Sequence, residues 1–397
     1  MVRLNKKLNP LDTGRDAAEF SARLHKLVVG QDDAIAQIVN VYQTWLAGMS
    51  SPGRPIGNFL FLGPTGTGKT RLVEATAESL VGNARSVIKV DCAEFQHSHE
   101  IAKLIGSPPG YLGHRETRPF LSQEALNQHH TEEVKISFVL FDEIEKASDS
   151  LWNLLLGILD KATLTLGDNK RVDFSNSMVF LTSNLGAAEM DSMLRPRLGF
   201  AAMQVEEYDG QSKAGEALNE KISRTALEAV RRKFTPEFVN RIDRIAVFHP
   251  LGTEQLDRIL GIELRLIERR ILETAGKTPF VFYLTAEARS YLLREGTDVK
   301  YGARHLKRAI EKALVHPLSN LVASGQILRG DLIRVEFDAD SGALEFVKEA
   351  EQIPAYVMTG IVDEAMDPLK VVAAAAPAAE PEYAATVRAK RQRGGWI

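Results

Sequence analysis

The sequence predicts an α/β protein with a large domain built on a mainly parallel sheet and a small helical domain that carries short strands. In the first part of the chain, short apolar runs end in polar residues and lead into helical patterns, which is the order of a parallel sheet with crossover helices. After residue 252 the pattern becomes almost entirely helical, with two short strands near its end.

The chain of 397 residues is long enough for two or three domains. We expect an N-terminal helical extension (residues 1–26), a large α/β domain (27–250), a small lid domain (251–348) and a mostly disordered Ala/Pro-rich tail (349–397). The tail is predicted because the stretch from Val371 to Thr386 has no periodicity for packing. Trp396 and Ile397 at its end are a candidate docking peptide, and a solvated tail is the alternative.

Composition excludes several classes of protein. The net charge of −3 argues against a general binder of nucleic acid or anionic membranes. No apolar stretch approaches the roughly 18 residues of a membrane span, and the basic N-terminus leads into no apolar signal core. Cys92 is the only cysteine, so it forms no internal disulfide and no cysteine-rich metal site. We therefore expect a cytoplasmic protein.

The first elements are two helices joined by a short turn. Helical spacing predicts them at residues 16–26 and 32–49, with the turn Val28-Val29-Gly30-Gln31 between them. Val28 and Val29 are candidates to pack on an adenine ring. Simple hydrophobic contacts before a helix are the alternative.

A glycine-rich loop then follows a buried strand at Phe59 to Leu62 and precedes a helix at Arg71 to Leu80. The loop fits G-x-x-x-x-G-K-[ST] with Gly63, Pro64, Thr65, Gly66, Thr67, Gly68, Lys69 and Thr70. Its glycines let backbone N–H groups turn inward around phosphate oxygens at the positive end of the helix. Lys69 supplies a charge for the β and γ phosphates, and the Thr70 hydroxyl has magnesium within reach. The chain is therefore predicted to bind a nucleoside triphosphate.

The next two strands frame an irregular loop. Strands are predicted at residues 86–90 and 135–141, and the loop at 105–114 holds Pro108, Pro109 and Gly110, which present Tyr111 on its tip. A surface tyrosine is the alternative. The second of these strands ends in Asp142, which can hold magnesium, and Glu143, which can polarise a water for attack on the γ-phosphate.

The remaining elements complete the sheet and the small domain. A strand at residues 177–182 ends near Asn184, whose amide can lie beside the γ-phosphate because ligands bind beyond the carboxyl ends of parallel strands. Residues 185–214 are expected to form a long irregular loop, followed by a helix and a strand at 245–248. The small domain should hold helices at 254–272, 285–295, 303–314 and 317–323, and strands at 332–337 and 343–347.

Seven motifs occur in one order: VVGQ, GPTGTGKT, GSPPGYLG, VLFDEIEKA, TSNLG, FTPEFVNRID and YGARHLKR. From about Leu27 to Val347 the chain thereby resembles the second ATPase module of the Clp family of AAA+ protein unfoldases. The resemblance is specific, because GSPPGYLG and PEFVNRID are not general ATPase signatures. It implies ATP and magnesium as cofactors.

The resemblance also implies a role for each motif residue. Lys69 and Thr70 would be Walker A, Asp142 and Glu143 Walker B, and Asn184 the sensor 1 residue. Arg241 would be an arginine finger that enters the neighbouring subunit's site, and Arg304 the sensor 2 arginine. Tyr111, followed by Leu112, would grip an unfolded polypeptide in a central pore. For both arginines a surface ion pair is the alternative.

The chain also departs from the family pattern. It has no room for the other domains of the large family members, so we expect a stand-alone single-ring protein. Residues 161–167 lack the arginine and aspartate of the usual second pore loop, and His114 stands where an aromatic residue is common. Leu198, Gly199 and Phe200 resemble the tripeptide by which protease-coupled members dock a Clp-type peptidase, and an apolar anchor for the loop is the alternative.

These observations favour an ATP-driven homo-oligomeric ring, a hexamer by resemblance, that threads unfolded or tagged protein substrates and has no membrane partner. A AAA+ motor on nucleic acid is one alternative, which the net charge disfavours. A nucleotide-switched scaffold with little turnover is the other, although such a scaffold has no chemical need for Glu143 or Arg241.

Overall fold

A computed structural model describes residue 9 and residues 12–107, 119–194, 213–273, 278–297 and 302–363. The predictions for Tyr111, Leu112 and the tripeptide 198–200 lie outside these residues, as does the tail from residue 364. The chain divides into two compact units. The first comprises Met1–Leu260 and Gly296–Lys307, and the second comprises Gly261–Glu295 and Arg308–Ile397.

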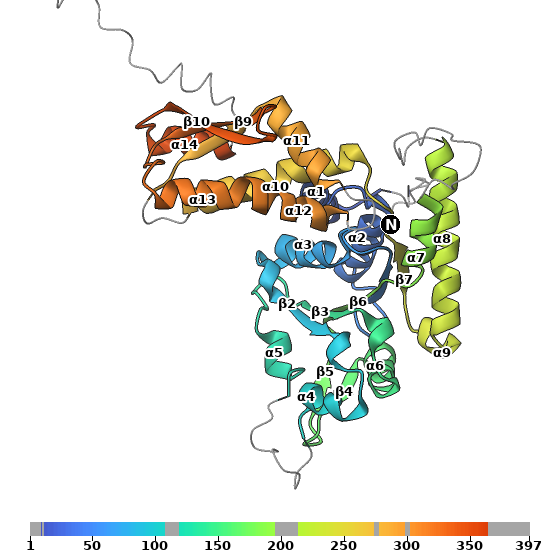
Figure 1. The fold of residues 1–397 in the computed structure, drawn as a ribbon. Helices are drawn as coiled ribbons and strands as arrows, with labels where there is room; N and C mark the ends of the chain where they lie inside the picture. The colour runs from blue at the N-terminus through green and yellow to red at the C-terminus, as the bar shows by residue number, and fades with distance from the viewer. Residues whose placement is uncertain are drawn as a thin grey trace, which may run out of the picture. The chain divides into compact units, whose positions relative to one another are not determined.

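The first unit is built on a five-stranded sheet with the strand order β2-β3-β6-β1-β7, and every neighbouring pair is parallel (Figure 1). Its strands are β1 (Gly57–Leu62), β2 (Val87–Asp91), β3 (Ser137–Asp142), β6 (Ser177–Ser183) and β7 (Arg244–Val247). The predicted α/β fold with a parallel sheet is confirmed. Because the strands are parallel, their carboxyl ends meet at one edge of the sheet.

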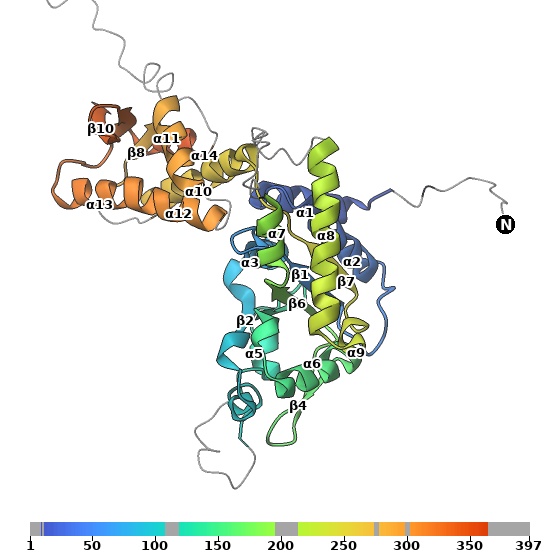
Figure 2. The same cartoon turned by 45° about the vertical axis from the view of Figure 1, so that its right-hand side comes forward.

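Helices cover both faces of this sheet, because successive strand residues point to opposite sides. Phe59 and Phe61 pack into one core with α1 (Arg15–Leu27), α2 (Asp32–Leu46) and α3 (Lys69–Val81). Leu60 and Leu62 pack into the other core with α6 (Asp149–Lys161), α8 (Lys213–Lys233) and α9 (Pro236–Val239). Figure 2 shows α8 running along the sheet. The near-continuous apolar strands of the sequence reflect this burial on both faces.

Several short elements were not predicted. They are α4 (Ala102–Ile105), α5 (Gln123–Asn127), α7 (Ala187–Leu194), and the antiparallel pair β4 (Thr163–Thr165) and β5 (Arg171–Asp173). Helix α7 lies within residues 185–214, for which the sequence predicts an irregular loop. Elements of three to eight residues are too short to give a periodic pattern, so only their tertiary contacts define them.

The second unit contains a three-stranded sheet with the order β10-β9-β8. β9 (Leu332–Asp338) pairs antiparallel with β10 (Ala343–Ala350), and these are the two predicted strands. β8 (Val281–Leu284) adds a parallel edge strand that was not predicted. The small domain with mixed short strands is confirmed. The helices of this part of the chain are α10 (Thr253–Glu273), α11 (Ala286–Gly296), α12 (Ala303–Ile310), α13 (His316–Ala323) and α14 (Ala355–Asp363).

A π-helical stretch at Glu311–Val315 joins α12 to α13. Pro317 lies in the first turn of α13 and has no N–H group for the helical bond to the preceding turn. The wider turn accommodates this missing bond, so the two predicted helices form one continuous helical path.

Residues 349–363 differ from the disordered tail expected from residue 349. Helix α14 buries Val357, Met358 and Ile361 against Val281 of β8 and Leu332 of β9. The burial of these apolar side chains stabilises a helix that is too short to be stable alone.

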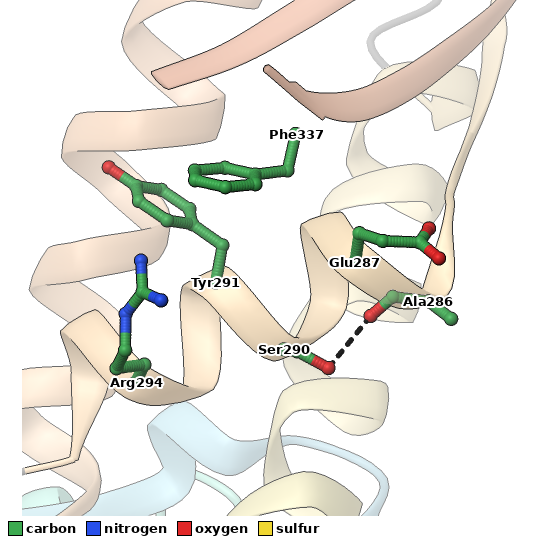
Figure 3. Close-up of a pocket in the computed structure, with 6 residues that line it drawn as sticks. All are labelled: Ala286, Glu287, Ser290, Tyr291, Arg294 and Phe337. Atoms are coloured by element: carbon green, nitrogen blue, oxygen red, sulfur yellow. Dashed lines mark hydrogen bonds between the residues drawn. The ribbon is translucent and has the colours of Figure 1, made fainter. Parts of the chain in front are cut away.

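A pocket of about 410 Å³ lies in the second unit, between α11 and β9 (Figure 3). Tyr291 and Phe337 stack with ring centroids 4.8 Å apart, and the guanidinium of Arg294 lies 5.6 Å and 5.7 Å from the two ring centroids. Glu287 lies on α11 one turn before Tyr291 and also lines the pocket.

No helix among the described residues is both long and apolar enough to cross a membrane.

Glu268 of α10 should make the stability of the second unit depend on pH. Burial raises the pKa of its carboxyl from 4.5 to about 7, with Arg265 opposing the shift. The folded protein therefore binds more protons than the unfolded one between these two pKa values, and stability falls as pH rises through that window. We expect Glu268→Gln to raise the melting temperature at pH 8 by about 3–10 °C, and by much less at pH 5.

Calorimetry of the variant at both pH values checks this expectation. Glu345→Gln, on the exposed side of β10, is the matched control and should show no such difference between the two pH values. An equal change at pH 5 and pH 8 for Glu268→Gln would contradict the titration argument.

Candidate nucleotide site

The phosphate-loop sequence joins the carboxyl end of β1 to the first turn of α3. Gly63 has φ 143°, and a Cβ there would lie 2.5 Å from the carbonyl oxygen of Phe248, so only glycine fits beside β7. Gly66 and Gly68 also have positive φ, of 83° and 100°. Gly68 is the N-cap of α3 and has no side chain to cap it. The loop therefore ends at a helix N-terminus whose N–H groups suit an anion.

Lys69 is the buried cation of this loop, with 8% of its surface exposed. Its Nζ donates to the carbonyl oxygens of Gly63 (2.6 Å) and Pro64 (2.9 Å) and to Oδ1 of Asn184 (2.9 Å). Burial lowers the pKa of Lys69 to about 8, and the nearby carboxylates of Asp142 and Glu145 oppose this shift. Phosphate oxygens can replace the carbonyl contacts and supply the countercharge that the burial requires.

Asn184 connects the lysine to the acidic pair at the end of β3. Its Nδ2 donates to Oε1 of Glu143 at 3.2 Å while its Oδ1 accepts from Lys69. Its backbone N–H donates to Oε1 of Glu145 at 3.0 Å. β6 lies between β1, which leads into the loop that holds Lys69, and β3, which ends at Asp142 next to Glu143. The parallel strands therefore bring an ammonium, an amide and a carboxylate into one chain of contacts at the carboxyl ends of the sheet.

Thr182 of β6 fixes the two acidic residues. Its hydroxyl donates to the Asp142 carboxylate and accepts the backbone N–H of Glu143 at 3.1 Å. Glu143 has φ 55°, a left-handed conformation that costs energy for a side chain with a Cβ. At this bend the Asp142 carboxylate contacts the Thr182 hydroxyl, whereas the Glu143 carboxylate contacts the Asn184 amide. The two neighbouring carboxylates therefore have different partners.

The site offers oxygen donors for magnesium. The Asp142 carboxylate and the Thr70 hydroxyl are hard oxygen ligands of the type that Mg²⁺ prefers. Among the described residues there is no cluster of three or more His, Cys, Asp or Glu side chains that would form a metal cage. This donor set suits an ion that also takes phosphate oxygens and water as ligands.

Arg304 belongs to the first unit and approaches the phosphate loop. The backbone N–H of Ala303 donates to the carbonyl oxygen of Gly66 at 3.1 Å. A Cβ on Gly302 would lie 2.9 Å from the same oxygen, so the approach requires glycine. The positive charge of Arg304 contributes to lowering the pKa of Lys69.

Arg241 lies at the amino end of β1, whereas the phosphate loop lies at its carboxyl end. Its carbonyl oxygen accepts from Nδ2 of Asn58 (3.1 Å) at the start of β1, whereas the phosphate loop follows the end of β1, about 15 Å away. Its guanidinium is ion-paired with Asp160 (3.0 Å) and Glu237 (3.9 Å) and is about one-third exposed. The structure therefore does not bring Arg241 to the phosphate loop of its own chain.

Val28 and Val29 are both buried, each with 5% of its surface exposed. Val28 belongs to the same hydrophobic core as Ile35 and Phe248. Such packing is the alternative to adenine contact, namely simple hydrophobic contacts before a helix. The turn lies beside the phosphate loop, because Nε2 of buried Gln31 donates to the carbonyl oxygens of Thr67 and His249, both at 3.1 Å. Contact of the two valines with an adenine ring stays a prediction.

Sequence reasoning missed three residues that organise this site: Gln31, Glu145 and Thr182. Gln31 was visible only as the polar end of VVGQ, and Glu145 and Thr182 only as neighbours of the acidic pair and Asn184. Each acts by a hydrogen bond to a residue distant in the sequence, so local patterns carry no signal for it.

A glycine-rich loop between a parallel strand and a helix, with a carboxylate pair at the end of a nearby strand, defines a P-loop nucleoside triphosphatase. The family described as "AAA domain (Cdc48 subfamily)" matches residues 54–245, and the "C-terminal, D2-small domain, of ClpB protein" matches residues 251–335. The chain belongs to the Clp/Hsp100 family of AAA+ ATPases and carries their D2 module. Membership of an AAA family implies ATP binding and ATPase activity.

Curated relatives agree with this placement. The chain is 38% identical over 317 residues to the chaperone protein ClpB of Pseudomonas putida, covering 80% of this chain and 33% of that protein. It is 36% identical over 332 residues to the ATP-dependent Clp protease ATP-binding subunit ClpC of Staphylococcus saprophyticus, covering 84% and 38%. The chain thus spans about a third of the length of these relatives.

Solved structures resemble the fold as well. Hsp104 in its closed state with ATPγS and FITC casein matches with a TM-score of 0.67 and 30% identity, covering 83% of this chain and 52% of that one. The extended conformation of the S. cerevisiae Hsp104:casein complex matches with a TM-score of 0.68 and 29% identity, covering 85% and 53%.

Proposed function

We propose that this protein is an ATP-driven unfoldase that assembles into a homo-oligomeric ring, a hexamer, and threads unfolded or tagged polypeptides through its centre. The contact chain from Lys69 through Asn184 to Glu143 supports the proposal, because the ammonium and the carboxylate lie on either side of one amide. In the proposed roles, Lys69 binds phosphate and Glu143 polarises water. The casein named in the Hsp104 structures supports a polypeptide as substrate.

The chemistry follows from the donors at the sheet edge. Lys69 and the loop N–H groups would bind the β and γ phosphates, with Thr70 and Asp142 holding magnesium, which neutralises phosphate charge when it is bound. Glu143 would orient the attacking water, and Asn184 would fix both that carboxylate and the phosphate. Arg304, which lies beside the loop, would add positive charge at the nucleotide.

Arg241 would act on the neighbouring subunit. Arg241 lies beside the start of β1, too far from the phosphate loop of its own chain to reach it. Its side chain is about one-third exposed, so another subunit can contact it. An arginine supplied in trans makes turnover depend on ring assembly.

Tyr111, with Leu112 beside it, would contact the polypeptide. We expect Tyr111→Ala to abolish unfolding of a fluorescent protein substrate while leaving basal ATP turnover within about twofold, because an aromatic side chain provides the grip and takes no part in the chemistry. Tyr111→Phe, which keeps the ring, is the matched control and should retain unfolding. Normal unfolding by Tyr111→Ala would remove this residue from substrate contact.

A peptidase partner at Leu198, Gly199 and Phe200 stays a prediction, and the name of the ClpC relative is what supports it. The cytoplasmic location also stays a prediction. The nucleic-acid motor and the low-turnover scaffold are the alternatives, and ATP turnover measured with casein and with DNA separates them.

A further inference from the structure

Glu143 makes a second contact that the proposed chemistry does not use. Its Oε2 accepts a hydrogen bond from Nζ of Lys146, three residues later, while its Oε1 accepts from Asn184. Glu143 is the N-cap of the 3₁₀ turn at Ile144–Lys146, and Lys146 is the last residue of that turn. Both oxygens of the carboxylate therefore have a protein donor, and Lys146 competes with a water molecule for Oε2.

The ion pair is not needed to fold this turn. The backbone N–H of Lys146 donates to the carbonyl oxygen of Glu143 at 3.0 Å, and that of Ala147 donates to Ile144 at 3.2 Å. Ile144 is fully buried, and its carbonyl oxygen accepts the indole N–H of Trp152 at 3.1 Å. Backbone bonds and burial thus hold the turn without the Lys146 side chain. Its ammonium hydrogen-bonds Glu143 and also lies in the field of the Glu145 and Asp91 carboxylates.

The pair is also accessible and easily opened. The side chain of Lys146 is 47% exposed and that of Glu143 is 33% exposed. Water competes strongly for ion pairs of this exposure, so they contribute little to stability. By contrast, Asn184 is held by two contacts, with Lys69 and with Glu145. Oε1 of Glu143, which accepts from Asn184, is therefore held more firmly than Oε2.

We propose that Lys146 is a positioning residue that restrains the Glu143 carboxylate in a resting orientation and so limits basal ATP turnover. The inference rests on the proposed role of Glu143 in hydrolysis. When the lysine contact opens, Oε2 turns toward the attacking water while Asn184 retains Oε1. Lys146 acts through Glu143 and takes no direct part in the reaction.

The test compares Lys146→Met with Lys146→Arg in steady-state ATP turnover. We expect Lys146→Met to raise kcat by about threefold to tenfold, since the pair is weak, with the affinity for a fluorescent ATP analogue unchanged. Lys146→Arg retains a cation and should behave like the parent protein. Lys89→Met is the matched control, because Lys89 is also 47% exposed and pairs with Glu74 away from the acidic pair.

Unchanged turnover in Lys146→Met would overturn the inference, and so would a decrease in kcat that Lys146→Arg restores, because the lysine would then assist Glu143. The double variant with Glu143→Gln should be as inactive as Glu143→Gln alone. If Glu143→Gln itself keeps full turnover, the proposed function of Glu143 fails instead, and the two failures are thereby distinguished.

Discussion

Replacing Glu143 with glutamine is expected to lower ATP turnover by about 10²–10⁴-fold while ATP still binds. Glutamine has nearly the same shape, and its carbonyl oxygen can still accept the hydrogen bond from Asn184. It has no negative charge with which to polarise a water. Phosphate release measures the loss of turnover, and binding of a fluorescent ATP analogue checks that the site is intact.

Glu145→Gln provides the comparison two residues later. The substituted amide oxygen can still accept the backbone N–H of Asn184, which is the role that the structure gives Glu145. We expect less than about tenfold loss of turnover, because the Glu145 carboxylate accepts from the Asn184 backbone and is not proposed to polarise the attacking water. A normal rate for Glu143→Gln, or an equal loss for both variants, would remove Glu143 as the water-polarising residue.

Replacing Arg241 with alanine should cost about 10³–10⁵ in turnover, the range for an arginine that stabilises charge on a transferring phosphoryl group. Each subunit keeps a complete Lys69–Asn184–Glu143 chain of contacts, so nucleotide binding should be retained. Arg244→Ala is the matched control, since Arg244 is an exposed arginine three residues away at the start of β7. Its turnover should stay close to that of the parent protein.

Mixing Arg241→Ala with Glu143→Gln subunits distinguishes action in trans from a local defect. In randomly mixed rings, about a quarter of the interfaces combine an intact Glu143 with an intact Arg241 from the neighbour. We expect the mixture to recover measurable turnover that neither variant shows alone. If mixed rings form and remain inactive, Arg241 does not act on the neighbouring site.

The sheet and the phosphate loop were predictable because their signals are local. Apolar runs such as Phe59 to Leu62 are buried on both faces, and the loop glycines need positive φ or close packing that only glycine allows. The carboxyl ends of β3 and β6 bring Asp142 and Asn184 together because parallel neighbours share an edge. These parts of the site follow from the position of each residue at the carboxyl end of a parallel strand.

The contacts that organise the site were not predictable in the same way. Gln31 and Thr182 act across 36 and 40 residues of sequence, on Thr67 and Asp142. Whether Arg241 and Arg304 serve the same nucleotide also depends on tertiary structure, since both appear in the sequence only as arginines in short motifs. Helix α14 was missed because its stability comes from burial of Val357 and Ile361 rather than from local propensity.

The central claim is that ATP hydrolysis in an assembled ring is coupled to a polypeptide. The most direct test measures ATP turnover by the purified protein with and without casein, while light scattering follows its mass in solution. We predict an ATP-dependent ring whose turnover rises severalfold with casein and does not rise with DNA. A monomer with no response to casein, or a response to DNA alone, would contradict the claim.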